Sequence, residues 1–286
     1  MHRYSYYKTA ACTLNVSIGD PQANKEEILK CIQELDSDTQ LVVFPELCIT
    51  GYTCQDLFYE HTLLNSAKQV LFEIVEELPE NLVTVLGLPL EIENKLYNCA
   101  AICFNHDILG IQVKTYIPSY NEFYETRWFS SASELKENTT FTYKDKKVPV
   151  SNHIVFKDTT TSACLGIEIC EDLWVTIPVS STHALAGANV LCNLSASNEI
   201  ISKANYRRNL VKDQSAKCYA GYVYASAGPT ESSSDLVFSG HNLICENGTI
   251  LSETKTDKTI YGQIDLDHLN HDRLHYKTSM QDLFHV

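Results

Sequence analysis

Three short segments of the sequence place a reactive side chain directly after an apolar run. Glu46 follows the run LVVFP, Lys114 follows GIQV, and Cys170 ends the run ACLGIEIC. Apolar runs of this length predict buried strands, and open α/β sheets gather their ligand sites beyond the carboxyl ends of the strands. We therefore expect the glutamate, the lysine and the cysteine to lie close together.

These three residue types are together suited to nucleophilic acyl transfer. A free cysteine thiol has a pKa of about 8.5 and needs a base to become a nucleophile. A carboxylate in a partly apolar pocket can be that base, and a lysine stabilises both the thiolate and the oxyanion of a tetrahedral intermediate. Taken singly, they also fit a buried structural cysteine, a helix-capping glutamate and a solvated lysine. Their occurrence at three successive strand ends favours a catalytic site.

Periodic apolar residues predict the elements that would carry these groups. Helical spacing follows Asn24 and Glu27, which form a candidate capping box, and recurs over residues 64–78. Two further helices are expected over 183–188 and 205–220. Strands are expected over residues 41–44, 83–88, 97–104, 108–114, 163–170, 189–196, 222–227, 236–245, 249–254 and 259–266.

This alternation of strands and helices predicts an α/β layered fold. The tripeptide Asn105-His106-Asp107 between two β-rich runs predicts a hairpin. The polar stretch 136–147 is interpreted as a surface excursion, and neither a Ser/Gly-rich linker nor an internal repeat divides the sequence. We therefore expect a single domain over residues 1–286.

Charge and hydropathy exclude several classes of function. The chain has 22 basic and 36 acidic residues and a formal net charge of -14, a poor match for a phosphate backbone, so we expect no nucleic-acid partner. No apolar stretch reaches the roughly 18–20 residues of a membrane helix, so we expect no membrane association. The first twenty residues lack the apolar core of a signal peptide. A soluble, cytoplasmic protein is expected.

The eleven cysteines favour a reducing compartment. Their number is odd, several lie within apolar runs, and no pair has C-x-x-C spacing. The pattern His268, His271 and His275 has helical spacing but is interpreted as a solvated helix end, so no metal site is expected.

Extended motifs around the three reactive residues resemble a known family. They are PEL-x-x-TGYTCQDLF at 45–58, K-x-Y-x-P-x-Y-x-EFYE at 114–125 and CEDLW-x-x-x-P at 170–178. The sequence resembles the nitrilase (carbon–nitrogen hydrolase) superfamily, and within it the glutaminase domains of glutamine-dependent NAD+ synthetases, over essentially its whole length. The resemblance implies a nitrilase-like α-β-β-α sandwich and a homo-oligomer paired through helices.

The same resemblance implies a Glu-Lys-Cys triad. Glu46 would be the general base, Cys170 the nucleophile that forms a thioester, and Lys114 the residue that holds the oxyanion. Glu122, eight residues beyond the lysine, would orient the lysine. A surface glutamate at a helix start is the alternative for Glu122.

Substrate-binding residues carry over one at a time. The resemblance implies Tyr120 and Ser197 as contacts of L-glutamine, and Lys203 as the partner of the substrate carboxylate, with Glu171 and Phe123 as weaker candidates. Free glutamine is a zwitterion, so its pocket needs a cation at one end and an acid at the other. A packed aromatic ring is the alternative for Tyr120, and a solvated lysine for Lys203.

The implied activity is hydrolysis of L-glutamine to glutamate and ammonia, which would supply ammonia for NAD+ synthesis. No cofactor is expected in this domain. ATP and Mg would belong to an NAD+ synthetase domain or subunit, fused or separate, whose S-G-G-x-D-S phosphate loop this sequence lacks; the string Ser239-Gly240-His241 is only similar. Two alternatives remain: a stand-alone amidase or nitrilase acting on another small amide, and a catalytically idle scaffold.

Overall fold

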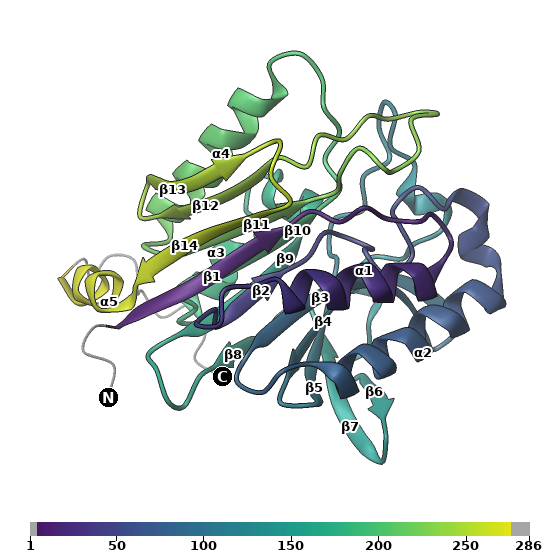
Figure 1. The fold of residues 1–286 in the computed structure, drawn as a ribbon, viewed down its shortest axis with the longest axis horizontal. Helices are drawn as coiled ribbons and strands as arrows, with labels where there is room; N and C mark the ends of the chain where they lie inside the picture. Colours follow the sequence, from purple (N-terminus) through teal and green to yellow (C-terminus); the bar gives the residue numbers. More distant parts are fainter. Residues whose placement is uncertain (1–4, 276–286) are drawn as a thin grey trace.

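A computed structural model describes residues 5–275, so both ends of the domain expected over residues 1–286 lie outside the described residues. Two β-sheets pack face to face, with helices on both outer sides (Figure 1). The helices are α1 Pro21–Gln33, α2 His61–Glu77, α3 Val179–Leu185, α4 Lys203–Lys217 and α5 Leu266–His275. Short 3-10 turns are η1 Gln55–Tyr59, η2 Glu125–Arg127, η3 Ala132–Glu134 and η4 Cys170–Leu173.

The first sheet has the strand order β14-β1-β2-β3-β4-β5-β7-β6. In it β1, β2 and β3 run parallel, and β14 pairs antiparallel with β1. Its strands are β1 Tyr6–Cys12, β2 Leu41–Val43, β3 Val83–Ile92, β4 Lys95–Phe104, β5 Asp107–Val113, β6 Thr140–Tyr143, β7 Lys146–Ser151 and β14 Thr259–Asp265.

The second sheet has the order β13-β12-β11-β10-β9-β8, with β9, β10 and β11 parallel. Its strands are β8 Val155–Lys157, β9 Cys164–Ile169, β10 Val190–Ser195, β11 Gly221–Ser226, β12 Asn242–Glu246 and β13 Thr249–Thr254. Helices α1 and α2 cover the first sheet, and α3 and α4 cover the second. The expected α/β fold with α-β-β-α layering is therefore confirmed.

Burial on both faces explains the uninterrupted apolar runs at the strands. In β2, Leu41 and Val43 face the space between the sheets, and Val42 faces the helices. A strand covered on both sides has no polar face, so its sequence loses the alternation of a half-exposed strand. This packing fixes where each strand ends and therefore where the residues after it lie.

Helix α1 begins earlier than the sequence predicts. Asp20 caps it by accepting a hydrogen bond from a backbone N–H in the first turn, and Pro21 occupies the first helical position. Asn24 is instead buried within the helix, where its side chain exchanges hydrogen bonds with the backbone of Ser17 and donates to the Ile49 carbonyl at 3.0 Å. The capping-box prediction was wrong because this asparagine ties α1 to the segment after β2.

Two further predictions concern the hairpin at 105–107 and the strand over 236–245. The hairpin at 105–107 is confirmed, since β4 and β5 pair antiparallel across Asn105 and His106, which have φ angles of 48° and 59°. The strand expected over 236–245 is shorter, because only β12 pairs and the preceding residues form a loop in which Phe238 packs against Tyr52.

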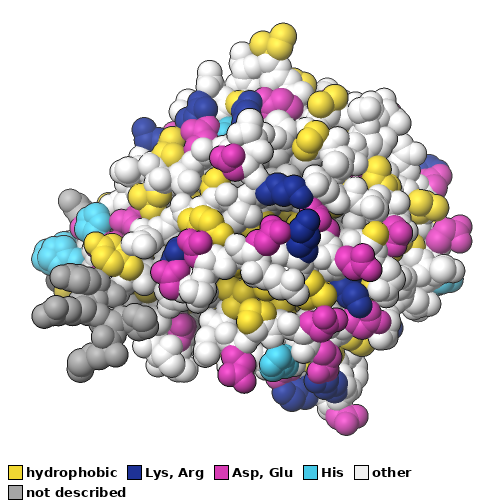
Figure 2. All heavy atoms as spheres, in the orientation of Figure 1, with side chains coloured by type: hydrophobic (Ala, Val, Ile, Leu, Met, Phe, Trp, Pro, Cys, Tyr) yellow, Lys and Arg dark blue, Asp and Glu magenta, His cyan; other side chains and the backbone are white. Residues whose placement is uncertain are grey.

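Charged side chains of both signs lie on the surface. On the face seen in Figure 2, lysine and arginine side chains lie beside acidic ones. Within residues 5–275, no helix is both long and apolar enough to cross a bilayer.

Candidate active site

Residues that follow β2, β5, β9 and β10 meet at one end of the two sheets. The carboxylate of Glu46, after β2, accepts a hydrogen bond from Lys114 Nζ at 2.6 Å, and both side chains are fully buried. Cys170 begins η4 directly after β9 and is 6% exposed. The backbone N–H of Ala196, after β10, donates to Glu46 at 2.8 Å. Glu46 and Lys114 thus meet at this end of the sheets, and the charges of both act on the Cys170 thiol, as the three strand ends predict.

Three donors hold Glu46 in place. Besides Lys114 and Ala196, the amide of Asn98 on β4 donates to Oε1 at 2.7 Å. Gly87 on β3 leaves room for this loop, because a Cβ there would lie 2.6 Å from the Pro45 carbonyl oxygen. These donors bond both carboxylate oxygens of Glu46 and so hold the group in one orientation.

A second buried glutamate holds the lysine, and it is Glu125. Both oxygens of Glu125 accept hydrogen bonds from Lys114 Nζ at 2.8 Å, and the hydroxyl of Tyr52 donates to Oε1 at 2.8 Å. Burial raises the pKa of Glu125, opposed by Lys114 and reinforced by Glu46. Burial lowers the pKa of Lys114, but the two carboxylates outweigh it and raise that pKa well above its ordinary value.

The prediction that Glu122 orients the lysine was therefore wrong. The side chain of Glu122 instead accepts a hydrogen bond from the Asn198 amide. The chain folds back after the lysine, with the Glu125 N–H bonded to the Pro118 carbonyl at 3.0 Å, and this turns Glu125 inward. The string EFYE contains both glutamates, and no local signal in the sequence distinguishes the buried one.

Cys170 has a strained backbone conformation and a thiol whose pKa is raised. Its φ angle is 45°, a left-handed conformation that costs a residue with a side chain about 1–2 kcal/mol. Burial is the main cause that raises the pKa of the Cys170 thiol, and the charge of Glu46 adds to it while Lys114 opposes it. A thiol in this state needs a base to remove its proton before it can attack a substrate.

Asp172, which the sequence analysis did not select, joins the lysine segment to the cysteine turn. Its carboxylate accepts hydrogen bonds from the backbone N–H groups of Thr115 at 3.0 Å, Tyr116 at 2.9 Å and Ile169 at 3.1 Å. Burial raises the pKa of Asp172 to about 8 against the effect of these donors. This side chain fixes the spacing between the residues after β5 and the turn that starts at Cys170.

The predicted substrate-binding residues fall into two connected groups. In the first, the Tyr120 hydroxyl donates to both oxygens of Glu171 at 3.0 and 2.9 Å, and its ring packs edge-on against Phe123 at 6.0 Å. Burial raises the pKa of Glu171. Tyr120 is 50% exposed, so its hydroxyl lies at the rim of the site.

In the second group, Lys203 at the start of α4 lies between two aromatic rings. Its ammonium is 5.5 Å from the ring centre of Phe123 and 5.2 Å from that of Trp174, and it donates to the Asn198 side chain. Burial is the main cause that lowers the pKa of Lys203. Ser197 accepts a hydrogen bond from the buried Arg207 at 3.1 Å. Sequence reasoning missed Trp174, although it lies within the CEDLW motif.

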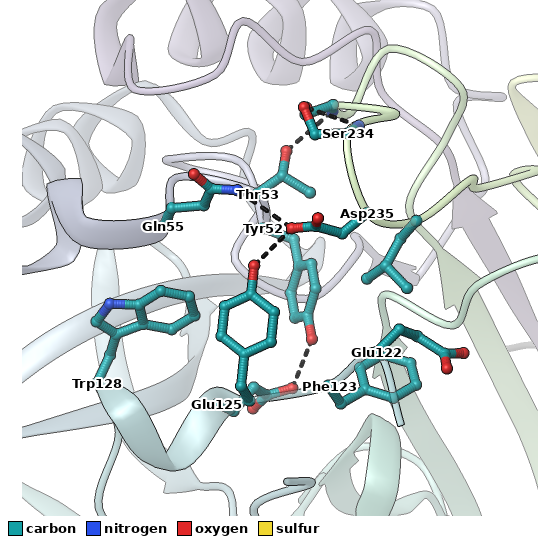
Figure 3. A pocket seen from close by; sticks show the side chains of 12 residues that line it. Tyr52, Thr53, Gln55, Glu122, Phe123, Glu125, Trp128, Ser234 and Asp235 are labelled. Carbon is teal, nitrogen blue, oxygen red and sulfur yellow. Dashed lines mark hydrogen bonds between the residues drawn. The ribbon is translucent and has the colours of Figure 1, made fainter. Parts of the chain in front are cut away.

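A small cavity lies beside Glu125, the ion-pair partner of Lys114. Its volume is about 30 Å³, and Tyr52, Phe123, Glu125, Trp128 and Asp235 contribute to its lining. Figure 3 shows the Tyr52 hydroxyl directed at Glu125 beside this space. A cavity of this volume holds about one water molecule, so it is too small for an amino acid.

Comparison with known proteins identifies the family. The carbon–nitrogen hydrolase family matches residues 8–273, and the chain belongs to this family. Its fold is that of the nitrilase superfamily: Nit3 of Saccharomyces cerevisiae, a member of branch 10 of that superfamily, has a TM-score of 0.74 and 19% identity over 98% of this chain and 97% of its own. The expected nitrilase resemblance and the expected class of hydrolase acting on carbon–nitrogen bonds are confirmed.

More similar proteins are considerably longer. The glutamine-dependent NAD(+) synthetase of Mycobacterium leprae is 36% identical over 280 residues, which are 96% of this chain and 41% of that protein. The human protein of the same name is 30% identical over 85% of this chain and 35% of its own length. A structure of the synthetase from Cytophaga hutchinsonii has a TM-score of 0.80 and 29% identity over 91% and 43% of the two chains. The chain thus spans about two fifths of these relatives.

Proposed function

We propose that this chain is the glutamine-hydrolysing part of a glutamine-dependent NAD+ synthetase. The observation that carries the proposal is the buried contact of Glu46 with Lys114, whose charges both act on the thiol of the strained Cys170. The relatives named above support glutamine as the substrate. The ammonia released would serve a synthetase domain or subunit that binds ATP and Mg, whereas this domain would need no cofactor.

In the first half of the proposed reaction, Glu46 takes the proton of the Cys170 thiol. The thiolate attacks the side-chain amide carbon of glutamine, and the oxyanion that forms is stabilised by the Lys114 ammonium and the backbone N–H of Glu171. The carbon–nitrogen bond then breaks, and Glu46 returns its proton to the leaving nitrogen. Ammonia leaves, and the glutamyl group remains on sulfur as a thioester.

In the second half, water hydrolyses the thioester. Glu46, again ionised, removes a proton from the water molecule, and the resulting hydroxide attacks the thioester carbon. Collapse of the second tetrahedral intermediate breaks the carbon–sulfur bond, and the proton on Glu46 returns to Cys170. Glutamate leaves and the enzyme is restored.

Recognition of free glutamine would use the rim of the site. Lys203 and Ser197 would bind the substrate carboxylate, and the pair of Tyr120 and Glu171 would bind its ammonium group. The aromatic ring of Phe123 would pack against the aliphatic part of the substrate. All eleven cysteines lie within the described residues, and none of them forms a disulfide there. This supports a reducing, cytoplasmic location.

The test is release of ammonia and glutamate from L-glutamine by the purified protein, with Cys170→Ala as the control. We expect turnover in the wild type and its loss in the variant. Retained turnover in Cys170→Ala would refute the mechanism. A preference for acetamide or another small amide over glutamine would instead identify a stand-alone amidase.

A further inference from the structure

Arg207 is a fully buried cation outside the catalytic triad. It lies on α4 with none of its surface exposed. Arginine is seldom fully buried without partners that satisfy its charge and its five donors. The partners of this guanidinium therefore indicate what the residue does.

On its inner side the guanidinium holds the segment that follows β10. Its NH2 group donates to the Ser197 hydroxyl at 3.1 Å and to the Asn198 carbonyl at 3.0 Å. The side chain of Asn198 in turn bonds to Lys203 and to Glu122. One buried cation thus fixes a serine hydroxyl and, through one asparagine, the ammonium of a lysine.

On its outer side the guanidinium is anchored to other elements. Its NH1 group donates to His241 Nδ1 at 2.8 Å and to Glu199 at 3.2 Å. Because the guanidinium can only donate, Nδ1 must accept, so the Nε2–H of His241 donates to Glu253 of β13 at 2.7 Å. Glu199 also accepts from Lys255 at 2.7 Å. Figure 1 shows α4 beside β12 and β13, the strands that flank this network.

We propose that Arg207 is a positioning residue that sets the affinity of the site for the carboxylate end of an amino-acid substrate. The inference rests on the proposed glutaminase function and assigns the control of substrate affinity to a residue that does not touch the substrate. The Ser197 hydroxyl accepts from Arg207, so its own hydrogen is left to donate elsewhere, which suits a carboxylate. Loss of the guanidinium frees both Ser197 and the Asn198–Lys203 pair.

The experiment compares Arg207→Gln with Arg273→Gln. Arg273 on α5 is a matched control, because its guanidinium also caps backbone carbonyls, those of Gly187, Ala188, Cys218 and Tyr219, which belong to other segments than the substrate-binding one. Glutamine turnover gives KM and kcat, and the alkylation rate of Cys170 is measured with a glutamine-shaped chloroketone and with iodoacetamide. Thermal unfolding is recorded for every variant.

We expect Arg207→Gln to raise KM for glutamine at least tenfold while kcat changes less than threefold. Alkylation by the chloroketone should slow to the same extent, and alkylation by iodoacetamide should not change. Arg273→Gln should lower the unfolding temperature and leave KM within twofold. Equal KM changes in the two variants, or an unchanged KM in Arg207→Gln, would overturn the proposal.

Arg207→Lys is a second variant for the case in which Arg207→Gln does not fold. It keeps the charge and one contact, so we expect an intermediate KM; a KM equal to that of the wild type would contradict the proposal. The proposed function is tested separately, on the wild type alone. If the wild type neither turns over glutamine nor reacts faster with the chloroketone than with iodoacetamide, the glutaminase assignment is refuted before any arginine variant is compared.

Discussion

Two lysines at this site have opposite electrostatic environments. Lys114 is fully buried between the carboxylates of Glu46 and Glu125, which raise its pKa. Lys203 lies between two aromatic rings with an asparagine as its hydrogen-bond partner, and burial lowers its pKa. The first charge is fully compensated within the protein, whereas the second has no carboxylate in ion-pair contact among the described residues.

This difference separates positioning for chemistry from readiness for binding. A cation compensated on two sides keeps its charge and place through the reaction cycle, which suits an oxyanion stabiliser. A desolvated cation without a carboxylate gains most when a substrate carboxylate arrives, because the ion pair then forms in a region of low dielectric constant. We therefore expect changes at Lys114 to affect kcat and changes at Lys203 to affect KM.

Removal of the compensated lysine should have the largest effect. Lys114→Met removes the proposed oxyanion stabiliser, and we expect kcat to fall by about 10²–10³-fold. It also leaves two buried carboxylates without their cation, which should cost about 3–5 kcal/mol of unfolding free energy. Steady-state kinetics and urea denaturation measure the two effects. A variant with normal kcat would show that Lys114 is structural only.

The two glutamates of the EFYE string allow a matched test of the next effect. Glu125→Gln removes the charge that fixes Lys114, and we expect kcat to fall by about 10²-fold, because small displacements of catalytic groups have costs of this size. Glu122→Gln makes the same chemical change three residues away and should alter kcat less than threefold. Steady-state kinetics of both variants at one pH measure the two changes in kcat. Equal losses would mean that the lysine is not held as the contacts indicate.

Lys203 should control binding without affecting folding. We expect Lys203→Met to raise KM for glutamine by about 10–100-fold, the loss of one charge-assisted contact, with little change in kcat. The unfolding free energy should change by less than about 1 kcal/mol, since the mutation leaves no buried carboxylate unpaired. Lys203→Arg should restore most of the affinity. A large fall in kcat with constant KM would contradict the division between the two lysines.

The fold and the proximity of Glu46, Lys114 and Cys170 could be predicted because both depend on patterns local in the sequence. Apolar runs and helical spacing record which residues are buried, and a residue just after a strand lies at the end of the sheet. Glu46, Lys114 and Cys170 could be selected on these grounds alone. They lie near one another because β2, β5 and β9 end at the same end of the two packed sheets.

The remaining parts of the site depend on partners distant in the sequence. Asp172 is defined by backbone groups near residue 115, Asn98 by its bond to Glu46, and Arg207 by residues just after β10 and just before β12. The choice between Glu122 and Glu125 depends on a fold-back that no periodicity records. Asp20 caps α1 because Asn24 is needed for a tertiary contact.

The smallest expected effect concerns pH. The pKa of Lys203 is lowered by burial, and only the protonated lysine attracts the substrate carboxylate. KM for glutamine should therefore rise as pH increases through this lowered pKa, below the ordinary lysine value of 10.5. The ammonium of free glutamine titrates in the same alkaline range, so Lys203→Arg is the necessary control: the variant keeps the effect of the substrate and loses that of the lysine. Identical pH profiles of KM in wild type and variant would mean that Lys203 stays protonated throughout, and that its environment resembles that of Lys114 more than the contacts indicate.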